Sequence, residues 1–150
     1  MRIAASVTPL LLSAAIALAP QSASAQTAPE SVTIDGRSFY ISSQIPDGWA
    51  GRYLYEENGA PIVQLNADGT GQFQPHGVPA IPIKYWAQVD EAGEVQRESY
   101  PGNPSYIEII VIQYGAGGGG NYPEGSYDRI SRMWHAERNC AIILGERYKC

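Results

Sequence analysis

The stretch IPIKYWAQV, residues 81–89, decides the fold class because apolar and other residues alternate along it. Successive side chains of a strand point to opposite sides, so one face would carry Ile81, Ile83, Tyr85, Ala87 and Val89. The other face would carry Lys84, Trp86 and Gln88. A period of two over nine residues predicts a β-strand with one face in a hydrophobic core.

Similar short runs lie on both sides of this stretch. The further strand candidates are residues 51–57, 60–65, 72–74, 94–100, 105–115 and 140–148. Between them lie turn-forming sequences such as NADGTG and DEAG. Residues 127–136 have helical spacing at Ile130, Met133 and Trp134, but the surrounding β-signals favour a strand. The pattern predicts an all-β protein, an antiparallel up-and-down barrel of about eight strands, with a β-sandwich as the alternative.

The N-terminus is typical of an export signal. Arg2 precedes an apolar stretch, residues 7–19, and Ala23-Ser24-Ala25 supplies the small residues that a signal peptidase requires. The apolar stretch is shorter than the roughly 20 residues that cross a bilayer. We therefore expect a signal peptide over residues 1–25, cleaved after Ala25, and a periplasmic or secreted protein.

The rest of the chain divides into two parts. Asp35-Gly36 lies between β-prone runs and predicts a tight hairpin within an N-terminal lead-in, residues 26–47. Residues 48–150 form the expected barrel domain, and no apolar run there is long enough for a transmembrane segment. Without Arg2 the chain has nine basic and 15 acidic residues, which argues against nucleic acid and anionic membranes as partners. The sequence leaves the oligomeric state open.

Cys140 and Cys150 are the two cysteines of the chain. An oxidising compartment favours a disulfide between them. In one continuous strand their Cα atoms would be ~33 Å apart, against the ~6 Å that a disulfide requires. The bond therefore requires the chain to double back, with Gly145 as the natural turning point. Free cysteines and a bond between two molecules are the alternatives.

Residues 115–125, GAGGGGNYPEG, formally satisfy the pattern G-x-G-x-x-G. A nucleotide loop of that kind opens directly into a helix whose N-terminus holds the phosphates. Pro123 and Gly125 prevent a helix from starting there, and no Walker-type lysine follows. We interpret the stretch as a mobile strand connection, and as the first place to look for a lid or a contact loop.

Catalytic and metal-binding patterns are weak along the whole chain. His76 and His135 are isolated, without the spacing of C-x-x-C or H-x-x-x-H metal sites. The sequence has no G-x-S-x-G elbow, and Glu56 and Glu57 would point to opposite faces of a strand. The sequence therefore predicts no metal site, no cofactor and no enzyme activity.

Aromatic side chains are the more informative set, with three Trp, ten Tyr and two Phe. In a barrel of about eight strands, inward aromatic residues either fill the core or line a cavity for one small ligand. The candidate ligand contacts are Tyr53, Tyr55, Tyr85, Trp86 and Trp134. Core filling is the alternative interpretation.

The run DGWAGRYLYEE, with the later IVQLNADGTGQF and KYWAQVDEAGEV, resembles small lipocalin-like (calycin) barrels over residues 48–148. In that family a Gly-x-Trp opens the first strand, and an Arg near the C-terminus packs across the aromatic ring to close the barrel. Gly51 and Tyr53 stand at the Gly-x-Trp position, with Tyr in place of Trp, and Arg147 stands at the position of the closing Arg. The resemblance implies a barrel with one open end that binds small hydrophobic molecules or partner proteins.

Together these patterns predict an exported, non-catalytic protein that binds a small apolar ligand in a β-barrel. The alternative is an envelope interaction protein, such as an inhibitor or accessory subunit, that uses loops and sheet edges to bind another protein. A small molecule that co-purifies with the protein would favour the first function, whereas a protein that is repeatedly empty and has a filled interior would exclude it.

Overall fold

The computed structural model describes residues 28–54, 61–75, 77–99, 101–144 and 146–148. The predicted signal peptide and its cleavage site after Ala25 lie outside these residues. The strands are β1 (Glu30–Ile34), β2 (Arg37–Ser42), β3 (Gly51–Leu54), β4 (Pro61–Leu65), β5 (Thr70–Phe73), β6 (Ile81–Val89), β7 (Arg97–Ser99), β8 (Tyr106–Tyr114), β9 (Tyr127–His135), β10 (Cys140–Ile143) and β11 (Glu146–Tyr148). A short 3₁₀-helix, η1 (Gly119–Asn121), joins β8 to β9. Within the described ranges, no helix has the length and apolar character needed to cross a membrane.

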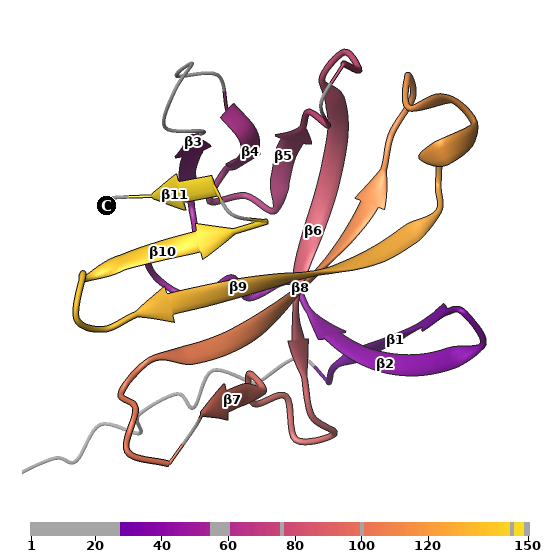
Figure 1. Cartoon of the computed structure of the whole chain (residues 1–150). Coiled ribbons are helices and arrows are strands. Elements are labelled where there is room, and N and C mark those ends of the chain that lie inside the picture. Colours follow the sequence, from indigo (N-terminus) through magenta and orange to yellow (C-terminus); the bar gives the residue numbers. More distant parts are fainter. Residues whose placement is uncertain (1–27, 55–60, 76, 100, 145, 149–150) are drawn as a thin grey trace, which may run out of the picture.

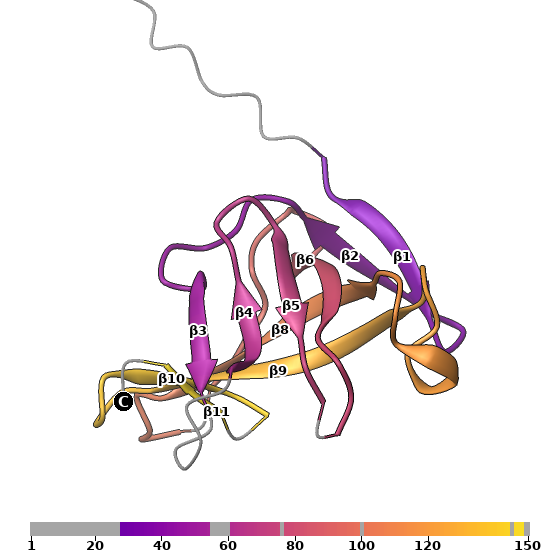
Figure 2. The ribbon, with the colours of Figure 1, turned by 90° about the horizontal axis from the view of Figure 1, so that it is seen from above.

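The strands form one antiparallel sheet that curls into a nearly closed barrel (Figure 1). Neighbouring strands follow the order β6-β5-β4-β3-β11-β10-β9-β8, and β6 also pairs with β8. In Figure 2, β3, β4, β5 and β6 stand in a row as one wall of the barrel. Sequential strands pair as hairpins along both halves of this ring, which makes the barrel an up-and-down one. The predicted all-β, antiparallel barrel is therefore confirmed.

The alternation in β6 separates the inside of the barrel from its outside. All five residues of the predicted inner face are at most 4% exposed and belong to the main core, whereas Lys84 is exposed on the other face. Gln88 also lies on the outer face but is only 6% exposed. Its side chain hydrogen-bonds to Gln96 and Arg129, so it is covered by neighbouring elements and still has partners for its amide.

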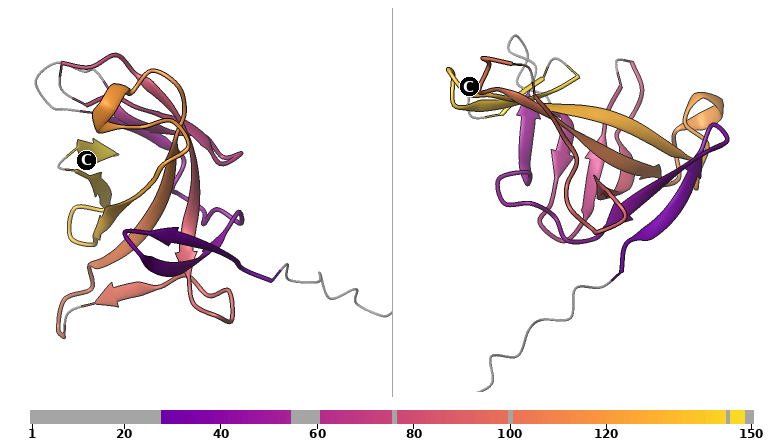
Figure 3. Two further views of the ribbon diagram at one scale, coloured as in Figure 1. Left: turned by 90° about the vertical axis from the view of Figure 1, so that its right-hand side faces the viewer. Right: turned by 90° about the horizontal axis from the view of Figure 1, so that it is seen from below.

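The β1–β2 hairpin covers the outer face of the barrel next to β6. Its turn, Asp35-Gly36, has the positive φ angles (48° and 75°) of the tight hairpin that the sequence predicts. Strand β2 pairs with the end of β6, and Figure 3 shows the hairpin apart from β10 and β11. Beneath it is a second apolar cluster, formed by Ile34, Ile41 and Val111 with Trp86 packed against them. The N-terminal hairpin is thus part of the sheet.

Two further strand predictions differ in outcome. Residues 127–135 form β9, so the β-context outweighs the helical spacing of this segment. The strand expected over residues 94–100 is shorter and comprises Arg97–Ser99. The Asp90 carboxylate accepts hydrogen bonds from the backbone amides of Ala92 and Glu94, so the turn after β6 extends into the residues that were expected to start the strand.

The glycine run after β8, predicted to be a mobile connection, packs against the end of the barrel at Gly118 and Tyr122. Tyr122, at the end of this loop, contacts Phe73 and Tyr114 with ring centroids 5.5 Å and 5.2 Å apart. Gly118 lies so close to Tyr122 that a Cβ atom there would overlap the tyrosine backbone. The loop therefore closes one end of the barrel with an aromatic cluster, and its glycines permit the close approach.

The chain doubles back between β10 and β11, as a disulfide between the two cysteines requires. The hairpin pairs Ala141 with Tyr148, so the segments next to the two cysteines lie side by side. Cys140 is fully buried at the start of β10. Cys150 and Gly145 lie outside the described residues, and the disulfide stays a prediction.

Tyr85 is expected to limit the stability of the barrel at high pH. It is 1% exposed, and its hydroxyl donates a hydrogen bond to the Asn66 carbonyl oxygen. Burial is the main cause that raises the pKa of Tyr85 to about 12, whereas an unfolded tyrosine titrates near pH ~10. The stabilisation is therefore complete below pH ~10 and is lost as the pH rises through about 12.

The test is the free energy of unfolding of wild type and Tyr85→Phe, measured by urea titration from pH 8 to pH 12. We expect the variant to lose about 1 kcal/mol at pH 8, because the hydrogen bond to Asn66 is absent. The gap between the two proteins should then narrow at alkaline pH. A gap that stays constant up to pH 12 would contradict the prediction.

Candidate functional site

Facing residues of β8 and β9 change from apolar to ionic to aromatic toward one end of the barrel. Both strands point every second side chain inward. The inward cross-strand pairs are Ile110 with Ile130, Glu108 with Arg132, and Tyr106 with Trp134. The last pair lies where β8 begins and β9 ends, and we call this end of the barrel the mouth.

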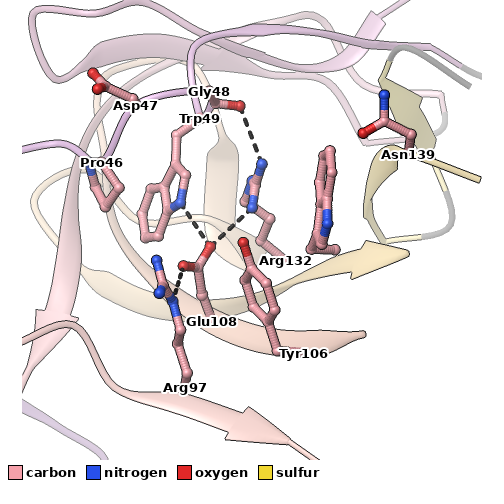
Figure 4. Close-up of a pocket in the computed structure, with 10 residues that line it drawn as sticks. Pro46, Asp47, Gly48, Trp49, Arg97, Tyr106, Glu108, Arg132 and Asn139 are labelled. Carbon is pink, nitrogen blue, oxygen red and sulfur yellow. Dashed lines mark hydrogen bonds and ion pairs between the residues drawn. The ribbon is translucent and has the colours of Figure 1, made fainter. Parts of the chain in front are cut away.

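Glu108 is the centre of the polar cluster below the mouth, and its side chain is 1% exposed. One carboxylate oxygen, Oε2, accepts hydrogen bonds from Trp49 Nε1 at 2.7 Å and from Arg132 Nη1 at 2.8 Å. The other oxygen, Oε1, accepts one from Arg97 Nε at 2.9 Å (Figure 4). A buried carboxylate requires such compensation, because an unpaired charge in a core is strongly unfavourable.

Arg132 fixes the segment that leads into β3. It is 3% exposed, its Nη2 donates to the Gly48 carbonyl oxygen at 3.1 Å, and its Nε donates to the Tyr53 hydroxyl at 3.2 Å. Its guanidinium carbon lies 5.7 Å from the centroid of the Trp49 ring, within reach of a cation–π contact. The Tyr53 hydroxyl in turn donates to the Trp49 carbonyl oxygen at 2.8 Å. Most hydrogen-bonding capacity of Arg132 is therefore used within the fold.

Arg97 lies at the edge of the same cluster and is accessible to solvent. Its side chain is 54% exposed, and its guanidinium carbon lies 4.9 Å from the centroid of the Tyr106 ring. The hydrogen bond to Glu108 raises the pKa of the Arg97 guanidinium above its ordinary value. Arg97 is thus a charged, oriented side chain that borders solvent.

These groups surround a pocket of about 370 Å³. The lining residues are Pro46, Asp47, Gly48, Trp49, Arg97, Tyr106, Glu108, Arg132, Trp134 and Asn139. Its floor is the ion-paired cluster, and part of its wall is aromatic. We call it the mouth pocket.

The structure describes four of the five predicted ligand contacts and does not bring these four together. Tyr53 and Tyr85 are buried in the core inside the barrel. Trp86 lies outside the barrel, where it packs against the cluster under the β1–β2 hairpin and contacts Tyr127. Trp134 lines the mouth pocket. Tyr55 lies outside the described residues.

Trp49 and Arg132 form an arginine–aromatic contact, whereas the resemblance to lipocalin-like barrels predicts one between Tyr53 and Arg147. Gly51 and Tyr53 do begin the first strand of the ring, and Tyr53 takes part in the cluster through its hydroxyl. Arg147 pairs along the backbone with Leu54, but its side chain lies outside the described part. The predicted closing role of Arg147 therefore stays a prediction.

Of the two histidines, His135 lies within the described residues. His135 ends β9, and its Nδ1 is buried without a hydrogen-bond partner among the described residues. His76, Glu56 and Glu57 lie outside them. The described residues contain no group of three or more His, Cys, Asp or Glu placed to hold a metal ion.

Four central residues of the cluster, Trp49, Arg97, Glu108 and Arg132, were not among the predicted site residues. One signal in the sequence points to them. Glu108 is the only charged residue in the apolar run from Ile107 to Ile112. It lies two and four positions before Ile110 and Ile112, so in a strand its side chain points to the same inner face as theirs. A charged residue on a core face predicts a buried ion pair, and so requires a cationic partner elsewhere in the chain.

Comparison of the chain with protein-family models, with curated proteins and with solved structures found no match. The resemblance to lipocalin-like barrels therefore stays a prediction, and the case for a function depends on the geometry of the mouth pocket.

Proposed function

We propose that this protein binds one small, mostly apolar molecule in the mouth pocket without transforming it. The observation that supports this is the pocket itself, about 370 Å³ in volume, with Trp134 and Tyr106 in its lining. Pockets for small molecules usually have volumes of roughly 300–1,000 Å³ and combine apolar and aromatic walls with oriented polar groups. The mouth pocket has three aromatic side chains in its lining, beside the charged residues of its floor. Export to the periplasm or the medium, as the N-terminal sequence predicts, would place this pocket in contact with molecules outside the cytoplasm.

The packing of the core favours the mouth over the deeper interior as the binding position. Tyr53 and Tyr85 are 0% and 1% exposed and fill the barrel together with aliphatic residues. The Phe73–Tyr114–Tyr122 cluster packs at the opposite end. A ligand that displaced these side chains would cost packing energy, whereas the mouth pocket already exists in the folded chain.

The test combines native mass spectrometry with a fluorescent probe. Protein purified from its own host should carry a small molecule, and the pure protein should bind N-phenyl-1-naphthylamine, an uncharged aromatic probe. Trp134→Leu should weaken binding of this probe about ten-fold, because an aromatic wall of the pocket is lost. Trp86→Leu is the matched control, since Trp86 lies on the outer face of the barrel.

Equal loss of probe binding in both tryptophan variants would indicate a general effect on folding, and thermal unfolding of each variant measures that effect. Unchanged binding by a folded Trp134→Leu protein, together with the absence of a co-purifying molecule, would overturn the proposed function.

A second candidate function, binding of an envelope protein, is favoured by the outer face of the sheet. Ile107, Met133 and Ile142 lie side by side on β8, β9 and β10, and Met133 is 36% exposed. Contiguous apolar residues on a protein surface are one feature of sites that contact another protein. If this function is correct, a protein partner should co-purify in fixed stoichiometry with the wild type and be lost from Met133→Glu, while probe binding at the mouth is unchanged.

A further inference from the structure

Arg97 has an oriented but largely unused guanidinium group at the mouth pocket. Its Nε is held by Glu108 at 2.9 Å, and its plane is supported by the ring of Tyr106. Neither terminal nitrogen has a hydrogen-bond partner among the residues that the structure describes. Since the side chain is 54% exposed, these two nitrogens are accessible to a bound molecule.

The neighbouring charges leave this position positive. Glu108 carries one negative charge and is paired with two guanidinium groups, those of Arg97 and Arg132. The three side chains therefore have a net charge of +1. Asp47 is the other acidic residue in the pocket lining, and Figure 4 shows its carboxylate pointing away from the cluster.

Arg132 and Arg97 therefore have different roles, although both pair with Glu108. Arg132 is buried and donates to Gly48 and Tyr53 as well as to Glu108. Within the described part of the chain, Arg97 donates a hydrogen bond only from its Nε. Its two terminal nitrogens, which form a planar fork, can therefore bind two oxygens of an acidic group.

We infer that the molecule bound in the mouth pocket carries one acidic group, such as a carboxylate or sulfonate, which accepts hydrogen bonds from the two terminal nitrogens of Arg97. Its apolar part lies against Trp134. This inference rests on the proposed function and specifies the chemical class of the ligand as a small amphiphilic acid.

The test uses two fluorescent probes that share an aromatic skeleton. The anionic one, 1-anilinonaphthalene-8-sulfonate, carries a sulfonate, and N-phenyl-1-naphthylamine lacks it. Wild type should prefer the anionic probe. Arg97→Gln should weaken binding of the anionic probe about ten-fold or more, because charge-assisted hydrogen bonds are lost, and leave binding of the uncharged probe unchanged. Arg97→Lys, which retains the charge without the fork, should give an intermediate loss.

Arg129→Gln is the matched control. Arg129 also stacks on an aromatic ring, with its guanidinium carbon 4.2 Å from the centroid of Phe39, and its Nε also binds a side-chain oxygen, that of Gln88. It lies in a separate groove on the outer side of the sheet, which Arg97 also borders. If Arg129→Gln weakened binding of the anionic probe as strongly as Arg97→Gln does, the probe would lie in that outer groove and the inference would be overturned.

Two further outcomes separate the inference from the proposed function. In the first, Arg97→Gln changes the binding of neither probe, or of both equally, while Trp134→Leu still weakens the binding of both. That result would support small-molecule binding but exclude the acidic group. If Trp134→Leu changes neither probe, the proposed function fails as well. Thermal unfolding shows whether each variant is folded, and Arg97→Gln should be, since Glu108 keeps Arg132 and Trp49 as partners.

Discussion

A Glu108→Ala variant is expected to lose about 3–5 kcal/mol of unfolding free energy. The substitution leaves the Arg132 guanidinium, 3% exposed, without its counter-charge. The other bonds of that guanidinium go to neutral oxygens, the Gly48 carbonyl and the Tyr53 hydroxyl, which do not replace a carboxylate. Trp49 Nε1 also loses its acceptor. A buried cation without a partner is among the most destabilising changes that one substitution produces.

Urea unfolding followed by tryptophan fluorescence measures this loss. Glu98→Ala is the matched control, because Glu98 lies on the adjacent β7 strand with its side chain exposed. We expect that control to stay within about 0.5 kcal/mol of wild type. Similar stabilities for the two variants would contradict the view that Glu108 is buried and paired.

A double variant separates the effect of the unpaired charge from the effect of lost volume. Glu108→Leu with Arg132→Met replaces the ion pair by apolar side chains, so no charge remains buried without a partner. Replacement of both members of a buried pair is often far less harmful than removal of one. The double variant should therefore be more stable than Glu108→Leu alone. If the stability losses of Glu108→Leu and of Arg132→Met simply add to give the loss of the double variant, the two residues do not interact in the way that the 2.8 Å contact indicates.

Local patterns predicted the fold well because β-structure has a short period. The alternation over residues 81–89 identified the inner face of β6, and all five predicted inward residues are buried. Asp35-Gly36 likewise predicted a hairpin turn, since both residues must adopt positive φ. The place of that hairpin on the outer face of the barrel was not predictable in this way. It depends on the pairing of Tyr40 with Val89, residues far apart in the sequence.

The candidate site was harder to predict than the fold for the same reason. Arg97 meets Glu108 only because β7 pairs with β8 in one register, and no local pattern specifies that register. Trp49 precedes the first barrel strand, and its contact with Arg132 depends on the closure of the whole ring. The inward direction of the Glu108 side chain could be predicted because Glu108 lies two residues before Ile110, but its partners could not be predicted. Long-range pairing, not composition, assembles this site.

A Gly118→Ala variant is expected to lose about 1–3 kcal/mol of stability, although alanine adds a single methyl group. An ideal Cβ on Gly118 would overlap the carbonyl oxygen and the Cβ atom of Tyr122, and would lie 3.1 Å from Ile81 Cδ1. The loop cannot relieve this by moving away without cost, because Tyr122 packs against Phe73 and Tyr114 at the end of the barrel. The glycine is needed here for close packing.

Gly120, two residues further along the same loop, provides the control. An added Cβ there would meet no atom within 4 Å. Gly120→Ala is therefore expected to be neutral or to gain up to about 1 kcal/mol, because alanine reduces the freedom of the unfolded chain. Thermal and urea unfolding of both variants measure the difference. If they were equally stable, the glycine run would be the loose connection that its composition suggests. A clear gap would instead show that the run is a packed end-cap, in which one glycine is required by contact with the barrel and another is not.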